Sequence, residues 1–342
     1  MAKAKKKASK KKKRGGSSRR RGLMVMISLV AVVATVVIAA MLMKPVPERM
    51  IATTLAGKIG KGEGSGPGQL KSPRGIATDS AGKIYVTDLG NDRISVFNAD
   101  GTPAFSFGKK GEEPPKSKPG EFNEASGVAV APDGTIYVAD AWNGRIQSFD
   151  PKGKPKAEFG GARYSFYSPR NVATDSQGNF YVADTGNSAV KVYNSGGKEL
   201  KVLGGRGKGG GHFNEVFGIA VNSKGEIFVA DPGNKRIHKF SALPAGEFVK
   251  DVKVPGWQIG APFWPHLACD AAGNVYAVDS NKSKIWVYDS SLNYRGTLSG
   301  QGNEVLNSPL GLAFGPQGDL YVAEMNANIV VKLGSFTVPA AK

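Results

Sequence analysis

Short apolar stretches recur along this chain, and six of them end on an acidic residue. The six are Ile84–Asp88, Ile136–Asp140, Phe180–Asp184, Ile227–Asp231, Val275–Asp279 and Leu320–Glu324. Their closing acids are 52, 44, 47, 48 and 45 residues apart. A period of this length is typical of propellers and solenoids, so the pattern predicts a repeat architecture.

The first repeat, residues 72–108, predicts four short strands separated by tight turns. Residues 76–78, Ile84–Asp88, Arg93–Phe97 and residues 104–108 have strand character, and Gly82 and Gly101 lie in turn clusters between them. Four antiparallel strands with tight turns make one propeller blade. Because a single blade leaves both faces exposed, we expect six blades packed around an axis in an all-β domain.

The last repeat, residues 306–333, has only three clear strands, so the ring needs a fourth strand from elsewhere. Residues 52–57 resemble the outer strands of earlier repeats, which end near Gly108 and Gly204. We therefore expect the N-terminal segment to close the last blade. The alternative is that residues 336–338 occupy that place.

The sequence pattern of the repeats resembles that of the NHL family. The matching residues in the first unit are residues 73–77, 85–88, Asn91, Arg93, Ile94, Phe107 and Gly108, and the second and fourth units repeat most of them. The fifth and sixth units depart from the pattern, with Lys282 in place of Asn and Glu324 in place of Asp. The resemblance implies a six-bladed propeller. It leaves function open, because the family includes ligand-binding, protein-binding, RNA-binding and enzymatic members.

The first 50 residues differ from the repeats. Residues 1–22 hold twelve Lys and Arg and no acid, and residues 23–43 hold no charge. At about 1.5 Å per residue such a segment spans a bilayer core of about 30 Å. We predict a basic cytoplasmic tail that attracts anionic lipids, a single transmembrane helix, a stalk at residues 44–51 and an extracytoplasmic propeller at residues 52–342. A cleaved signal peptide is the alternative.

Most of the formal net charge of +18 belongs to this tail. Without it the chain has 34 basic and 28 acidic residues, so we do not expect a nucleic-acid partner. The single cysteine, Cys269, permits no intramolecular disulfide, and buried packing is favoured over a catalytic thiol.

Candidate binding residues come from the position just before the Gly, Asn or Leu that starts each inner strand, here called the lead position. The six lead residues are Arg74, Ser126, Arg170, Phe217, His266 and Leu310. We expect them around the mouth of the central channel, where the two arginines and the histidine could bind a carboxylate, a phosphate or an acidic side chain. The alternative is that each Arg pairs with an acid of a neighbouring blade.

Aromatic residues lie in loops predicted on the same face. They are Trp142, Phe166, Tyr167, Phe263 and Trp264. They are candidate anchors of an interface, with loop packing as the alternative.

The repeated closing acids favour a structural role over a metal ring, because a residue repeated in every blade usually caps a turn. Some relatives in the family are zinc lyases that hold the metal with three histidines. This chain has three, His212, His238 and His266, and only His266 occupies a lead position. We therefore assign no metal, cofactor or catalytic residue.

The favoured prediction is a tethered recognition platform for a protein, peptide or glycan, bound through the channel-mouth loops. The alternatives are a metal-dependent lyase or lactonase at the same mouth and a structural spacer in an envelope assembly. The longest linker, residues 109–122, is rich in Pro and charge and is either a docking loop or a tolerated insertion.

Overall fold

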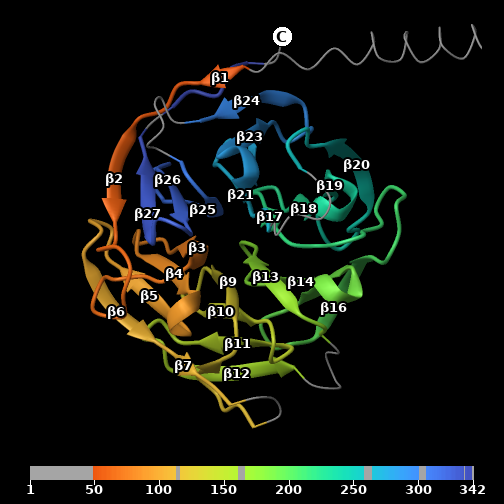
Figure 1. Ribbon diagram of the computed structural model, residues 1–342. Coiled ribbons are helices and arrows are strands. Elements are labelled where there is room, and N and C mark those ends of the chain that lie inside the picture. The colour runs from red at the N-terminus through yellow and green to blue at the C-terminus, as the bar shows by residue number, and fades with distance from the viewer. Residues whose placement is uncertain are drawn as a thin grey trace, which may run out of the picture. The chain divides into compact units, whose positions relative to one another are not determined.

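The computed structural model describes residues 49–112, 116–160, 166–257, 264–299, 306–334 and 336–340. Their strands form six main sheets around a central axis (Figure 1), which confirms the predicted all-β six-bladed propeller. The helices in these residues are three-residue 3₁₀ turns, none long and apolar enough to cross a membrane. The predicted tail and span, residues 1–43, lie outside the described residues.

Each blade has an inner strand that faces the channel and a second strand that ends on the repeated acid. The inner strands of blades one to six are β3 (Pro73–Thr78), β9 (Ala125–Val130), β13 (Pro169–Thr174), β17 (Ile219–Val221), β21 (Leu267–Cys269) and β25 (Pro309–Phe314). The second strands are β4 (Ile84–Asp88), β10 (Ile136–Asp140), β14 (Phe180–Asp184), β18 (Ile227–Asp231), β22 (Val275–Asp279) and β26 (Leu320–Glu324).

The third and outer strands complete the antiparallel blades. The third strands are β5 (Arg93–Phe97), β11 (Arg145–Phe149), β15 (Ala189–Tyr193), β19 (Arg236–Phe240), β23 (Lys284–Tyr288) and β27 (Ile329–Leu333). The outer strands of blades one to five are β6 (Pro103–Phe107), β12 (Pro155–Gly160), β16 (Glu199–Gly204), β20 (Phe248–Lys253) and β24 (Tyr294–Leu298). In blades one, three, four and five a 3₁₀ turn joins the second and third strands. In blade four this turn is Pro232–Asn234.

The hydrophobic core lies between the blades. Each of its six clusters combines side chains of two adjacent blades. In β4, Ile84 and Val86 pack against blade six, whereas Tyr85 between them packs against blade two. Successive side chains of a strand point to opposite faces, so a buried strand with apolar residues on both sides joins its blade to both neighbours.

The last blade is closed from the N-terminal end. Strand β2 (Leu55–Ile59) pairs antiparallel with β27, as predicted for this segment. Residues 336–338 do not fill that place. Phe336 instead packs on the cluster between blades five and six, with its ring 5.9 Å from that of Tyr276.

Residues that the sequence assigned to a stalk are part of the propeller. Strand β1 (Met50–Ile51) pairs in parallel with β24 of blade five, and Thr297 N donates to Arg49 O at 2.8 Å. Ile51 is buried in the cluster between blades five and six. The remaining predicted stalk, residues 44–48, lies outside the described residues.

The long linker between blades one and two folds back on itself. Strand β7 (Lys109–Lys110) pairs in parallel with β8 (Glu121–Phe122), and Phe122 is fully buried. The linkers into blades one and four contain the corresponding bridges, Glu63 with Leu70 and Arg206 with Phe213. The insertion therefore extends a loop whose two ends are fixed. Residues 113–115 lie outside the described residues.

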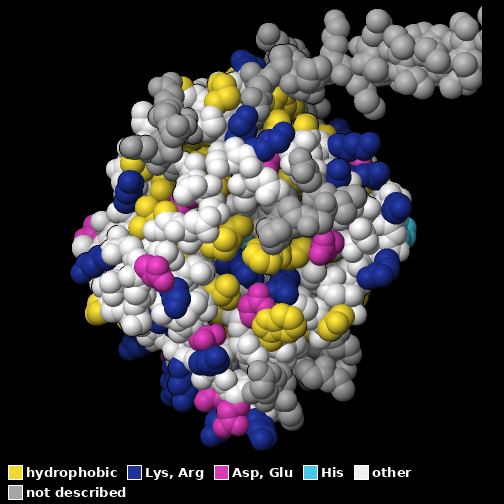
Figure 2. Space-filling model, in the orientation of Figure 1, with side chains coloured by type: hydrophobic (Ala, Val, Ile, Leu, Met, Phe, Trp, Pro, Cys, Tyr) yellow, Lys and Arg dark blue, Asp and Glu magenta, His cyan; other side chains and the backbone are white. Residues whose placement is uncertain are grey.

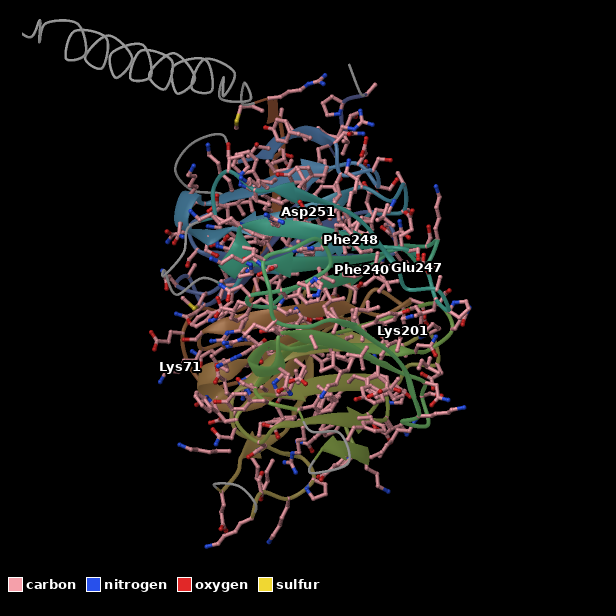
Figure 3. The ribbon with its side chains drawn as sticks, turned by 90° about the vertical axis from the view of Figure 1, so that its right-hand side faces the viewer. Lys71, Lys201, Phe240, Glu247, Phe248 and Asp251 are labelled. Carbon is pink, nitrogen blue, oxygen red and sulfur yellow. The ribbon has the colours of Figure 1, made fainter. Side chains whose placement is uncertain are left out.

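The outer rim of blade four carries an exposed aromatic residue. Phe248 of β20 lies against Phe240 of β19, with ring centroids 5.9 Å apart, as Figure 3 shows from the side. His238, which like Phe240 belongs to β19, is fully buried between Phe213 and Phe248.

The closing acids fasten the linkers that lead into the inner strands. Asp140 accepts from Asn123 N at 2.8 Å and from the side chains of Asn143, Arg145 and Gln147. Asp88, Asp184, Asp231 and Glu324 accept equivalent linker amides, from Lys71, Tyr167, Asn214 and Asn307. The side chains of Asp231 and Asp279 cap their 3₁₀ turns by accepting from the backbone N of Asn234 and Lys282. The acids thus have a structural role, which the sequence predicted, and it extends beyond turn capping.

Candidate functional site

The lead residues lie where the inner strands begin, at one end of the channel. Arg74, Ser126, Phe217, His266 and Leu310 are buried there. The backbones pack closely at this level: a β-carbon added to Gly127 would lie 2.7 Å from Asn171 Cα. Glycine after the lead residue permits that approach, and the lead side chains fill the axis.

Two lead arginines from different blades share one carboxylate. Arg74 Nη1 donates to Glu124 Oε1 at 2.8 Å, and Arg170 Nη1 donates to the same oxygen. Burial lowers the pKa of Arg74 and the charge of Arg170 adds to this, whereas Glu124 opposes both effects. The pairing predicted as the structural alternative is therefore present. The three side chains still carry a net charge of +1.

Two tryptophans cover the guanidinium groups. Arg74 Cζ lies 4.2 Å from the ring centroid of Trp264, and Arg170 Cζ lies 5.5 Å from that of Trp142. Both distances allow cation–π attraction, which strengthens where water is excluded. Trp142 and Trp264 thus form one cluster with Arg74, Arg170 and Glu124.

Beside this cluster lies an open hollow of about 790 Å³. Figure 2 shows hydrophobic, basic and acidic side chains gathered at the centre of this face. The hollow is lined by loops of blades two to five, including Trp142, Tyr167, Arg170, Phe217 and Trp264. Trp142 is 61% exposed and Tyr167 is 68% exposed. Phe263 lies outside the described residues.

Three charged residues of the mouth were not singled out from the sequence. Glu124, Glu215 and Arg206 lie in linkers, and the last two line the hollow. Glu124 and Glu215 stand two positions before the lead residues Ser126 and Phe217, where blades one and three have serine. Comparing that position across the blades would have found both acids. No local sequence pattern distinguishes Arg206 from the other linker residues.

Glu215 is an exposed residue whose carboxyl group lies in the wall of the hollow. Burial raises its pKa, the nearby Asp231 raises it further, and Arg170 opposes both effects. Its backbone N donates to Asp231 Oδ1 at 3.0 Å. The backbone of Glu215 is therefore held in place, and its carboxyl group is more readily protonated than that of an ordinary glutamate.

His266 is bound to another inner strand. Asn171 Nδ2 lies 2.9 Å from His266 Nδ1, and both residues are buried. Burial, followed by the charge of Arg74, lowers the pKa of His266 to about 3. The imidazole is therefore neutral near pH 7. A hydrogen bond from the amide to Nδ1 leaves the ring proton on Nε2.

The described residues do not fit a three-histidine zinc site. His238 is buried in blade four, with Nε2 3.3 Å from Asp231 Oδ2, and His212 is exposed in a linker. Zinc requires ligands that converge on one point, whereas His266 faces Asn171 in the channel. Among the described residues no group of three or more His, Cys, Asp or Glu side chains is arranged to hold a metal ion.

Two polar atoms at the mouth have no hydrogen-bond partner among the described residues. They are Ser126 Oγ and Arg74 Nε, both buried. Cys269, at the other end of its inner strand, is a partly buried free thiol whose pKa is raised by burial. It packs partly against the cluster between blades four and five, which agrees with the expected packing role.

Four segments of the chain match the NHL repeat: residues 70–97, 122–149, 166–193 and 213–240. Each runs from the linker of one of the first four blades to the end of its third strand. The chain therefore contains NHL repeats and folds as a six-bladed β-propeller, as the resemblance implied.

A Caenorhabditis elegans protein described as a probable peptidyl-alpha-hydroxyglycine alpha-amidating lyase is 34% identical over 99 residues. This match covers 28% of each chain. Among solved structures, a gluconolactonase from Xanthomonas campestris superposes with a TM-score of 0.60 at 15% identity, over 83% of this chain and 100% of the other. A streptogramin B lyase does so with a TM-score of 0.57 at 15% identity, over 83% and 98%. At such identity the two structures show a shared fold.

Proposed function

We propose that this protein is a recognition module whose channel mouth binds an anionic group carried by a protein, peptide or glycan. The observation that carries the proposal is Arg170, which lies in the wall of the hollow between exposed aromatic rings. Arginine presents a planar set of donors that matches a carboxylate or phosphate in two-point geometry. The aromatic rings supply contact area at little cost in conformational entropy.

The charge of the mouth supports an anionic ligand. Among the described residues Arg74 and Arg170 both pair with Glu124, so these three side chains carry a net charge of +1. Arg206 adds a further positive charge to the lining, and Glu215 opposes it. A partly desolvated positive site attracts an anion more strongly than an exposed lysine does.

We further propose that the module is tethered to a membrane by residues 23–43, with the propeller extracytoplasmic and the basic residues 1–22 against anionic lipids. The support is the sequence alone: an uncharged segment of 21 residues that follows twelve positive charges. Protease protection in intact cells, with one tag at each end of the chain, tests this topology. Equal digestion of both tags would contradict it.

The recognition role is tested by photo-crosslinking in the native membrane fraction, with the crosslinker placed at Ser168 in the lining of the hollow. We expect adducts that are lost in an Arg170→Ala, Trp142→Ala double variant and kept in Lys152→Ala, whose side chain lies at the opposite end of blade two. Adducts that persist in the double variant would contradict a role for the mouth.

A second candidate function is that of a lyase or lactonase acting at the same mouth. The similarity to the probable amidating lyase favours it, together with the carboxyl group of Glu215 in the hollow, whose pKa is raised. A carboxyl group whose pKa is raised in this way can act as a general acid or base. Turnover of a peptide ending in α-hydroxyglycine, abolished by Glu215→Gln, would establish this role. Absence of turnover with and without added divalent metal would remove it.

A further inference from the structure

The backbones that carry the two exposed aromatic rings of the hollow are held by hydrogen bonds. Tyr167 N donates to Asp184 Oδ1 at 2.7 Å, and Gly186 N donates to Tyr167 O at 2.8 Å. The Tyr167 ring rests against Gly186, where an added β-carbon would lie 2.1 Å from its Cδ1. Trp142 N donates to Asn123 O at 3.1 Å. Loops whose backbones are already ordered bind a ligand at a smaller entropy cost.

The polar part of the lining suits a ligand rich in hydroxyl groups. Asn214, Glu215 and Arg206 offer amide, carboxyl and guanidinium groups around the same hollow, and the hydroxyl of Thr185, which donates to Val216 O, can still accept a hydrogen bond. Planar amide and carboxyl groups can each bond to two neighbouring hydroxyls. The negative face of an aromatic ring attracts the weakly positive C–H groups of a sugar ring. Together these features match a carbohydrate with one face against an aromatic ring.

The same lining is a poor match to a peptide backbone. Peptides in extended form are usually held by main-chain hydrogen bonds to a free strand edge. Apart from Arg170 in β13, the residues of the hollow come from turns and linkers, such as those at 141–144 and 214–217. The described part of the hollow therefore offers no strand edge for a peptide to extend.

The position of Glu124 indicates that Arg74 and Arg170 are arranged to bind a carboxylate. It adopts a φ of +64°, and Ser72 and Ser168 make the same turn in the neighbouring blades with φ values of +51° and +53°. The turn therefore does not need a carboxylate. The acid at this one position provides an internal partner for Arg74 and Arg170, and a ligand carboxylate would compete with it for Arg170.

Resting on the recognition role proposed above, we propose that the ligand is an acidic sugar. Its carboxylate binds Arg170 with support from Arg206, its ring stacks on Trp142 or Tyr167, and Glu124 acts as a competing internal anion. A peptide carboxylate is the rival ligand and is one outcome of the test.

The test is calorimetric titration of the purified full-length chain in detergent with trigalacturonate, with maltotriose as the neutral sugar and triglutamate as the acidic peptide. We expect binding of trigalacturonate alone, weakened about tenfold or more by Arg170→Ala, because a charge-assisted pair is lost. Trp142→Ala should weaken it too. Phe248→Ala, an exposed aromatic on the rim, should leave it unchanged.

A variant that gains affinity guards against simple misfolding. Removing the internal anion with Glu124→Gln should tighten trigalacturonate binding about threefold or more and make it more sensitive to salt, because the site is then more positive. Unchanged or weaker binding in this variant, with an unfolding temperature that shows it is folded, would overturn the role of Glu124.

The outcomes separate this inference from the function on which it rests. If triglutamate binds with the same dependence on Arg170 and trigalacturonate does not, the sugar assignment is wrong and recognition at the mouth stands. If maltotriose binds as well as trigalacturonate, the carboxylate assignment is wrong. If no probe binds and the crosslinked adducts also persist in the double variant, both proposals fail.

Discussion

Asn171 Nδ2 lies 2.9 Å from His266 Nδ1 within the channel, and this contact joins the inner strands of blades three and five. These blades are not neighbours in the ring. In the other blades the residue after the lead position is Gly or, in blade five, Leu267. Asn171 therefore provides a polar link at the level of the mouth that packing between adjacent blades does not supply.

Acid should weaken the fold through His266. Its folded pKa of about 3 lies below the value of about 6.5 for an unfolded histidine, because burial and Arg74 disfavour the charged ring. The stabilisation that neutral His266 gives the fold is fully present above the unfolded pKa. It is lost as the pH falls toward the folded pKa, at roughly 1.4 kcal/mol per pH unit. Denaturant unfolding between pH 7 and pH 4 measures it.

His266→Asn is the matched variant for this prediction, because the amide oxygen can replace Nδ1 as acceptor without titrating. The free energy of unfolding of the variant should fall less steeply with acid than that of the wild type. Identical pH profiles would show that His266 is not the group responsible.

Loss of the carboxylate between the two arginines should destabilise the mouth. Glu124→Gln leaves Arg74 and Arg170 close together and is expected to cost about 1–3 kcal/mol of unfolding free energy at low salt. Added sulfate should restore part of it by screening the arginines and binding to them. Glu158→Gln, which breaks a more exposed pair with Arg145, should cost less than about 0.5 kcal/mol. Equal losses in the two variants would contradict the special role of Glu124.

The closing acid of blade three should hold both its turn and the Tyr167 loop. Asp184 accepts from Tyr167 N and Asn187 Nδ2 and pairs with Lys191 at 2.8 Å. Asp184→Asn should lower the free energy of unfolding by about 2–4 kcal/mol, since buried donors and a cation lose their partner. The control is Asp150→Asn in an exposed turn, which should cost less than about 1 kcal/mol. Hydrogen exchange at the Tyr167 amide should increase in Asp184→Asn alone, and an unchanged rate would argue against the linker role.

Two neighbours on β1 should differ sharply in their effect on stability. Ile51 is 3% exposed within the core cluster of blades five and six, whereas Met50 is 52% exposed. Ile51→Ala should cost about 2–4 kcal/mol through lost burial and a residual cavity. Met50→Ala should cost less than about 0.5 kcal/mol. Similar melting temperatures for the two variants would show that β1 is not part of the cooperative fold.

The architecture could be read from the sequence because its causes are local and repeated. Strand alternation, Gly-containing turns and the period of the closing acids each act within one blade. The N-terminal closing strand was also predictable, since residues 52–57 resemble the other outer strands. The pairing of Met50 and Ile51 with β24 was not, because two residues carry no periodicity.

At the mouth, the sequence by itself determined which positions face the channel, and it placed Arg74 and Arg170 among them. Only the tertiary structure decided their partners. Glu124 meets Arg74 and Arg170 from 50 and 46 residues away, and His266 meets Asn171 across 95 residues. Such contacts depend on how closely the blades pack around the axis, which the residues of one blade do not specify. The repeats thus encode the ring, and the ring brings together the charges of the site.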